Sequence, residues 1–207
     1  MALPGAGAHR FWGFSPALDL LAEAGDAHDD PETPRRFLLL SPGDPRHILR
    51  TLGALARMRG GATEQGDAPT LEFSVYEQAP ELLARHLLLL SVALDFELPR
   101  RERAELLLEL LANSLLREKT SAYLAARAEV LRRVVTENDG PLAPLVDLSL
   151  LKMRDRDKLH DVLSTWSEDV CGQASNTRGL QTGSQAGLPS LLLTRLSPAL
   201  DRCRATW

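Results

Sequence analysis

The chain has 207 residues, of which 44% are hydrophobic and 25% are charged, and this composition is typical of a globular protein with a hydrophobic core. Its formal net charge of −4 lacks the basic excess of an electrostatic nucleic-acid binder. The longest apolar stretch, residues 87–94, is interrupted by Ser91 and is far shorter than the about 20 apolar residues that a transmembrane helix needs.

The N-terminus and the cysteines indicate a cytoplasmic protein. The first residues, MALPGAGAHRFWGF, lack the charged start and the long apolar core of a signal peptide. Cys171 and Cys203 both lie in a polar C-terminal segment, which is consistent with reduced thiols in the cytosol. Neither cysteine has a partner at CxxC spacing and the five histidines are scattered, so the sequence predicts no metal site.

Residues 1–36 are interpreted as an N-terminal arm. An aromatic cluster at residues 11–14 precedes a short helix, for which Ser15 is the expected cap and Pro16 the first helical residue. We expect the aromatic side chains to dock on the domain as a packing clamp, with a partner-binding motif as the alternative. Residues 23–36 then read as a polar, proline-containing linker.

Residues 37–52 are the unit around which the rest of the sequence is interpreted. The apolar run FLLL predicts a buried strand, SPGDP predicts a turn, and the apolar residues that follow recur at helical spacing. Strand, glycine-bearing turn and helix begin a nucleotide-binding α/β unit, and they also begin any βαβ unit. Pro42 and Pro45 lack the N–H groups that a phosphate cradle uses, which favours a structural turn in which Gly43 permits the bend and Asp44 caps the helix.

A second strand is predicted at residues 71–77, where apolar and polar residues alternate. It ends in Glu77, and in doubly wound folds an acid at this place can hydrogen-bond a ribose hydroxyl. Glu77, Gly43 and Asp44 are therefore the candidate cofactor-binding residues. The alternative is an acid that ends a strand by chance. With only two strands evident, we expect an incomplete sheet with an exposed edge and apolar surface.

The predicted helix at residues 80–96 has almost no polar face, so we expect it to be buried on most sides. Arg85 and His86 lie near its start, where they either satisfy local carbonyls and acids or line a pocket. The first role is favoured, because buried polar groups are usually satisfied by nearby partners.

Amphipathic helices are predicted at residues 100–117 and 120–136 and from Pro144 to residue 166. The first of these helices is expected to expose a solvated polar stripe of Glu102, Glu105, Glu109 and Asn113. The composition then changes, and residues 167–207 are expected to be disordered, with residues 191–200 as a short helical or adhesive patch.

Four patches together resemble the dynein axonemal assembly factor 3 family. They read WGFSPALDL, LLLSPGDPRHILRTL, ARHLLLLSVAL and LSLLKMRDRD, and they cover about residues 11–166 in the family's order. Part of this pattern is also similar to an N-terminal domain shared with MYND-finger proteins. The chain departs from the family after Trp166, so it is interpreted as the family's N-terminal region in a shortened form with a divergent tail, as alternative splicing would produce.

The resemblance implies an α/β fold, in which residues 37–166 form a partial Rossmann-like, methyltransferase-like three-layer unit with a helical C-terminal part. It implies a cytoplasmic factor, without cofactor, that preassembles axonemal dynein arms and is needed for the motility of cilia and flagella. Its implied partners are axonemal dynein chains and other assembly factors or chaperones, and not nucleic acid or a membrane. The family's signature positions in this chain are Gly43, Asp44, Arg46, His47, Arg85 and His86.

Two alternatives to a non-enzymatic assembly factor stay open at this stage. One is an S-adenosylmethionine- or nucleotide-binding, methyltransferase-like enzyme, which would use the turn after the first strand and Glu77. The other is an inactive truncated isoform. The family implies no catalytic residue, and none is assigned.

Overall fold

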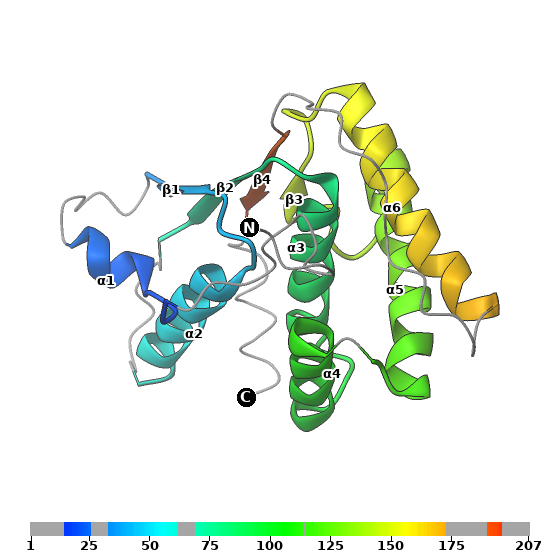
Figure 1. The fold of residues 1–207 in the computed structure, drawn as a ribbon. Helices are drawn as coiled ribbons and strands as arrows, with labels where there is room; N and C mark the ends of the chain where they lie inside the picture. The colour runs from blue at the N-terminus through cyan, green and yellow to red at the C-terminus, as the bar shows by residue number, and fades with distance from the viewer. Residues whose placement is uncertain (1–14, 26–32, 62–68, 114, 173–189, 196–207) are drawn as a thin grey trace, which may run out of the picture.

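The computed structural model describes residues 15–25, 33–61, 69–113, 115–172 and 190–195, and the structural statements below concern these residues. They contain a four-stranded sheet and six helices (Figure 1). In chain order the elements are α1 (Leu20–Ala24), β1 (Arg35–Leu40), α2 (Arg46–Gly61), β2 (Leu71–Glu77), α3 (Pro80–Ala93), α4 (Arg100–Ala112), α5 (Glu118–Glu137), β3 (Val146–Asp147), α6 (Met153–Gly172) and β4 (Ser190–Arg195). None of the described helices has the length and apolar composition needed to cross a bilayer.

The sheet has the order β1–β2–β4–β3 and is mixed. β1 and β2 are parallel, with Phe37 opposite Phe73, and α2 makes the connection that parallel strands require. β4 pairs antiparallel with β2 on one side and with β3 on the other. The chain is therefore an α/β protein that begins with the βαβ unit expected from its sequence. The Rossmann-like extension of this fold stays a proposal.

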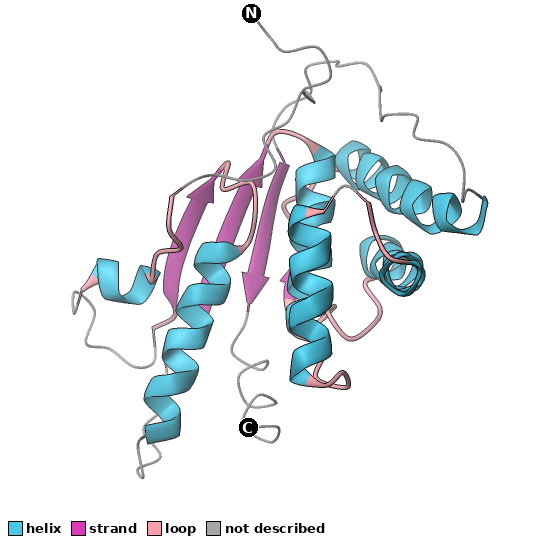
Figure 2. Cartoon of the chain, turned by 60° about the horizontal axis from the view of Figure 1, so that its bottom comes forward, coloured by secondary structure: helices cyan, strands magenta, loops and turns pink. Residues whose placement is uncertain are grey.

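The hydrophobic core extends from the sheet to α2 and α3, and it continues between α3, α5 and α6. Figure 2 shows α2 lying across the sheet, with α5 and α6 on the far side of α3. Phe73 is fully buried in β2, and its ring stacks on Phe37 with a centroid distance of 5.5 Å. The alternation of β1 turns Leu38 and Leu40 to the other side, where they are 62% and 66% exposed. β1 is thus an edge strand that exposes apolar side chains, as expected from the sequence. The sheet has four strands, however, and not only the two that the sequence made evident.

α3 is the central helix, and its burial on most sides confirms the expectation from its apolar sequence. Its buried side chains run from Leu82 to Val92 without a polar face. Pro80 lies in its first turn, where a missing N–H costs no helical hydrogen bond. It ends at Ala93, a few residues before the predicted end, because the chain turns into a loop that precedes α4.

Two predicted helix starts are wrong. α1 begins at Leu20 and not at Pro16, because the side chain of Asp19 accepts a hydrogen bond from the N–H of Leu21 and caps the helix there. α6 begins at Met153 and not just after Pro144. Residues 141–152 form turns on either side of the short strand β3. The buried leucines of this segment recur at three-residue spacing and so mimic a helical pattern: Leu142, Leu145, Leu148 and Leu151.

Glu109 is not on a solvated stripe, which corrects the interpretation of α4. It is only 5% exposed. Its carboxylate accepts hydrogen bonds from the backbone N–H of Arg117 at 2.6 Å and from the hydroxyl of Thr120 at 2.7 Å. These donors lie at the N-terminus of α5, where a negative charge is favourable. Hydrogen bonds from the side chain and backbone of Arg117, and then from Thr120, lower the pKa of Glu109 to about 2.

The predicted disorder of residues 167–207 is wrong in two places. α6 continues to Gly172, and Ser190–Arg195 form β4. β4, with the sequence SLLLTR, pairs with the edge of β2 that faces away from β1. Without β4, the backbone hydrogen-bonding groups at this edge of β2 would have no strand partner. The rest of that segment, residues 173–189 and 196–207, lies outside the described residues, and so does the aromatic cluster at residues 11–14.

Replacing Phe73 with alanine is expected to lower the free energy of unfolding by about 3–5 kcal/mol, because a fully buried ring is removed and a cavity is left. Urea unfolding monitored by circular dichroism measures this change. The control is Leu38→Ala on the exposed side of the neighbouring strand, for which a change within about 0.5 kcal/mol is expected. Equal losses in the two variants would contradict the assignment of the core to the Phe73 face.

The stability of the protein is expected to fall in acid partly through Glu109. Because its folded-state pKa of about 2 lies below the ordinary value of 4.5, the stabilisation by its carboxylate is complete above pH 4.5 and is lost as the pH falls towards 2. Glu109→Gln removes this part of the pH dependence, which thermal unfolding midpoints across that range measure. The exposed Glu105→Gln should keep the wild-type profile, and a wild-type profile in Glu109→Gln would refute the capping role.

Candidate functional site

The carboxyl ends of β1 and β2 lie side by side, and α/β proteins bind ligands at such an edge. Leu40, the last residue of β1, is in register with Tyr76 of β2. The turn at residues 41–45 leaves the sheet at this point, and the N–H of Ser41 still donates to the carbonyl of Tyr76 at 2.8 Å. The start of α3 follows the end of β2, so the sequence's candidate residues come from three segments that meet here.

The turn is shaped by Gly43 and Asp44. Gly43 has a φ of +74°, a backbone conformation that glycine adopts without steric cost. Asp44 is buried, and its Oδ1 accepts a hydrogen bond from the backbone N–H of Arg46 at 3.0 Å, which caps the N-terminus of α2. The same carboxylate pairs with the guanidinium of Arg46 at 2.9 Å, so both charges of the turn are neutralised locally.

Glu77 and Arg85 both form hydrogen bonds with the backbone of Gly43. Glu77 is 1% exposed, and its Oε1 accepts the N–H of Gly43 at 2.6 Å. Arg85 donates from Nη1 to the carbonyl of Gly43 at 3.2 Å and from Nη2 to the carbonyl of Leu111 at 2.7 Å. His86 places Nε2 3.3 Å from the same Oε1 of Glu77. Burial lowers the pKa of Arg85, and the nearby Asp44 opposes that shift.

We call Gly43, Asp44, Arg46, Glu77, Arg85 and His86 the Glu77 cluster. The structure thus brings together five of the six signature positions and the candidate acid. His47 differs, because its Nδ1 accepts the N–H of Leu18 at 3.0 Å and joins α2 to the segment before α1. The pKa of His47 is lowered, first by burial and then by Arg46, which favours the neutral ring that accepts this bond.

The Glu77 cluster is arranged as a structural clasp. A phosphate cradle needs free backbone N–H groups, but Gly43 donates to Glu77, Arg46 donates to Asp44, and Pro42 has no N–H. The carboxylate of Glu77 is buried and engaged, so in this conformation it is not presented to a ribose hydroxyl. Among the described residues there is no group of three or more His, Cys, Asp or Glu placed to hold a metal ion.

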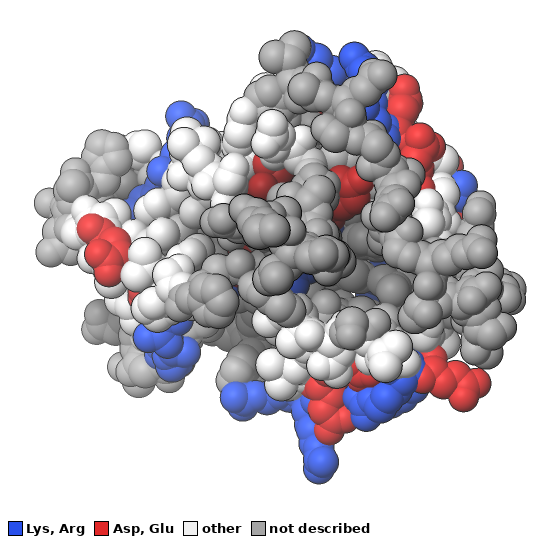
Figure 3. Space-filling view, in the orientation of Figure 1, with Lys and Arg blue, Asp and Glu red and all other residues white. Residues whose placement is uncertain are grey.

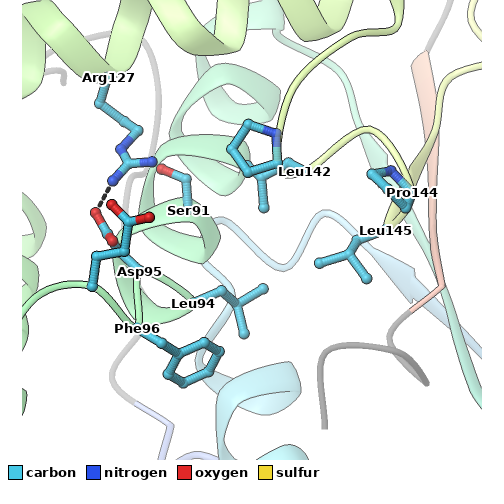
Figure 4. A pocket seen from close by; sticks show the side chains of 10 residues that line it. Ser91, Leu94, Asp95, Phe96, Arg127, Leu142, Pro144 and Leu145 are labelled. Atoms are coloured by element: carbon cyan, nitrogen blue, oxygen red, sulfur yellow. Dashed lines mark ion pairs between the residues drawn. The ribbon is translucent and has the colours of Figure 1, made fainter. Parts of the chain in front are cut away.

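Sequence reasoning did not find a second polar group, formed by Asp95, Tyr123 and Arg127. The hydroxyl of Tyr123 donates to Asp95 at 3.0 Å, and Arg127 pairs with the same carboxylate. Asp95 and Arg127 of this group line a cavity of about 360 Å³ in the described part of the chain, and no residue of the Glu77 cluster lines it (Figure 4). The only sequence signal was a pair of acids, Asp95 and Glu97, directly after an apolar helix.

Glu77→Ala is expected to lower the free energy of unfolding by about 1–3 kcal/mol, because the buried N–H of Gly43 loses its acceptor. Glu77→Gln keeps an acceptor oxygen and should cost less. Chemical unfolding of both variants measures the difference, with Glu137→Ala at the exposed end of α5 as the control. A Glu77→Ala protein as stable as the control would show that the clasp is not structural.

The comparison with known proteins identifies the N-terminal part of the chain. A family profile described as a domain of unknown function, DUF4470, matches residues 11–116. No solved structure matches the chain.

Curated relatives extend the similarity beyond that domain. The chain is 40% identical over 182 residues to "Dynein axonemal assembly factor 3 homolog" from Chlamydomonas reinhardtii, covering 76% of this chain and 25% of the relative. It is 38% identical over 170 residues to "Dynein axonemal assembly factor 3" from Xenopus tropicalis, covering 75% and 36%. It is 39% identical over 176 residues to the Mus musculus protein of the same name, covering 79% of this chain and 28% of the relative. The chain thus spans about a quarter to a third of the length of these relatives, and it belongs to the dynein axonemal assembly factor 3 family.

Proposed function

We propose that this protein acts in the cytoplasm in the preassembly of axonemal dynein arms, and so in the motility of cilia and flagella, through contacts with other proteins. The observation that carries the proposal is the family membership, since relatives named for this role match three quarters or more of the chain. The proposed partners are axonemal dynein chains and other assembly factors or chaperones.

The geometry of the Glu77 cluster supports a non-catalytic role. The N–H of Gly43 and the carboxylate of Glu77 bind each other, so the two groups that a dinucleotide or S-adenosylmethionine would need are already used. We propose that residues 37–166 are a Rossmann-like scaffold whose ligand-binding edge has become a structural joint, with residues 1–36 as an arm. The C-terminal segment contributes β4 to the sheet of this scaffold.

The charged side chains fit recognition of proteins better than binding to a polyanion. In Figure 3, basic and acidic side chains are interspersed over the described parts of the face shown, without a continuous basic area. Among the described residues several charged side chains form ion pairs, such as Lys119 with Glu102 and Arg101 with Glu105. A basic stripe is the usual footprint of nucleic-acid binding, so this distribution supports the proposal.

Depletion of this protein from cells that build motile cilia is expected to reduce outer and inner dynein arms in axonemal cross-sections and to slow ciliary beating. Electron microscopy of the axonemes and high-speed video of the cilia provide the measurements. Re-expression of the chain should restore the arms, and the same vector without the chain is the control. Intact arms and normal beating after depletion would contradict the proposed function.

Calorimetry with S-adenosylmethionine and S-adenosylhomocysteine separates the assembly factor from a methyltransferase-like enzyme. No saturable heat of binding is expected, because the N–H of Gly43 is already bonded to Glu77. Saturable binding that Gly43→Ala or Asp44→Ala abolishes would overturn the non-enzymatic assignment.

A further inference from the structure

The cavity between α3, α5 and the turn at residues 141–145 has the properties of a preformed binding site. Its volume of about 360 Å³ is in the range of small-ligand pockets. Leu94 and Phe96 form one apolar wall, and Leu142 and Leu145 form the other (Figure 4). The second wall is held in place by two turn hydrogen bonds, Ala143 N–H to the carbonyl of Gly140 and Leu145 N–H to that of Leu142, so it needs little ordering when a ligand binds.

A charged pair is fixed beside these apolar walls. Arg127 and Asp95 form an ion pair, and their side chains are only 15% and 10% exposed. Tyr123 locks the pair, because its hydroxyl donates to Oδ2 of Asp95 and accepts from Nε and Nη2 of Arg127. Burial raises the pKa of Tyr123 to about 12, so its hydroxyl keeps its proton and remains a donor.

The pair offers a ligand one donor and one acceptor. Within the described residues, the contacts above use Nε and Nη2 of Arg127 and Oδ2 of Asp95, whereas Nη1 and Oδ1 take part in none of them, and both residues line the cavity. A guanidinium N–H next to a carboxylate oxygen matches the C=O and N–H of a peptide backbone. The apolar walls beside the pair then match a side chain of that peptide.

The rim of the cavity selects the charge of the ligand. The exposed Glu97 also lines the cavity, so among the lining side chains the acids Asp95 and Glu97 outnumber the cation Arg127. The guanidinium of Arg103 is not part of this lining and stacks on the Phe96 ring at 4.8 Å from its centroid. A basic group in the ligand would complement this excess negative charge. We propose that the cavity binds a peptide segment of a partner protein in which an apolar side chain, placed between the two walls, is next to a basic residue.

This inference goes beyond the proposed function, because it concerns the chemistry of the ligand and does not depend on dynein arms. The test is an NMR titration of the ¹⁵N-labelled full chain with an acetylated, amidated Leu-Arg dipeptide. Saturable shifts are expected at the amides of residues 94–97 and at those of Leu142, Ala143 and Leu145, with a dissociation constant in the millimolar range. A Leu-Glu dipeptide should bind about five-fold more weakly, as expected for one charge at a partly exposed rim. A Ser-Arg dipeptide should bind about ten-fold or more weakly than Leu-Arg, because it has no leucine side chain to bury between the walls.

Glu97→Lys is expected to abolish the preference for Leu-Arg over Leu-Glu, because it reverses the rim charge at an exposed position. Asp157→Lys makes the same charge change on the exposed side of α6 and should keep the preference. The proposal is overturned if the dipeptide gives no saturable shifts at the cavity, or if Glu97→Lys leaves the preference unchanged. It is also overturned if deleting residues 196–207 shifts the cavity amides without peptide, or if a second copy of the chain covers the cavity in solution.

Discussion

The hydrogen bond from the N–H of Gly43 to the carboxylate of Glu77 is the contact on which the N-terminal half of this structure depends. A buried carboxylate is tolerated only when it is paired, and Glu77 finds its partners in the turn after the neighbouring strand. The bond therefore ties the end of β2 to the turn that starts α2. Arg85 adds the carbonyl of Leu111 to the same joint, so that β1, β2, α3 and α4 meet at one point.

The same joint explains why a strand–turn–helix unit can lack a nucleotide site. A phosphate cradle and the Glu77 clasp would use the same N–H group, and the buried carboxylate competes for it from within the protein. The ligand-binding edge of the α/β unit is thereby converted into a support for packing. A cavity of about 360 Å³ lies instead between α3, α5 and the turn at residues 141–145, where Arg127 and Asp95 are held beside apolar walls.

Buried carboxylates fix the ends of several helices in this fold. Glu109 of α4 caps α5, and Asp95 after α3 pairs with Arg127 in the middle of α5. Asp44 caps α2 within its own turn. Each of these carboxylates is largely removed from water and is stable there because it accepts two or more hydrogen bonds or an ion pair. They set where the helices begin and how their ends face each other.

Local sequence determined the parts of the protein that depend on near neighbours. The alternation in residues 71–77 predicted β2, the unbroken apolar surface of α3 predicted its burial, and the SPGDP turn predicted a glycine bend between strand and helix. The four patches in order also predicted the family. These features follow from hydrophobic periodicity and from the residues of the turn, and both can be recognised within a short stretch of consecutive residues.

Only the tertiary structure decided the pairings between distant segments. The periodicity of α4 predicted that Glu109 is exposed to solvent, because a local pattern cannot show that the N-terminus of α5 folds against this carboxylate. Periodicity extended a helix through the leucines before Met153, because turns at three-residue spacing give the same pattern. It also missed β4, whose strand form depends on the open edge of β2. The role of Glu77 likewise depends on tertiary structure, because its hydrogen-bond partner, the N–H of Gly43, lies 34 residues away in the sequence.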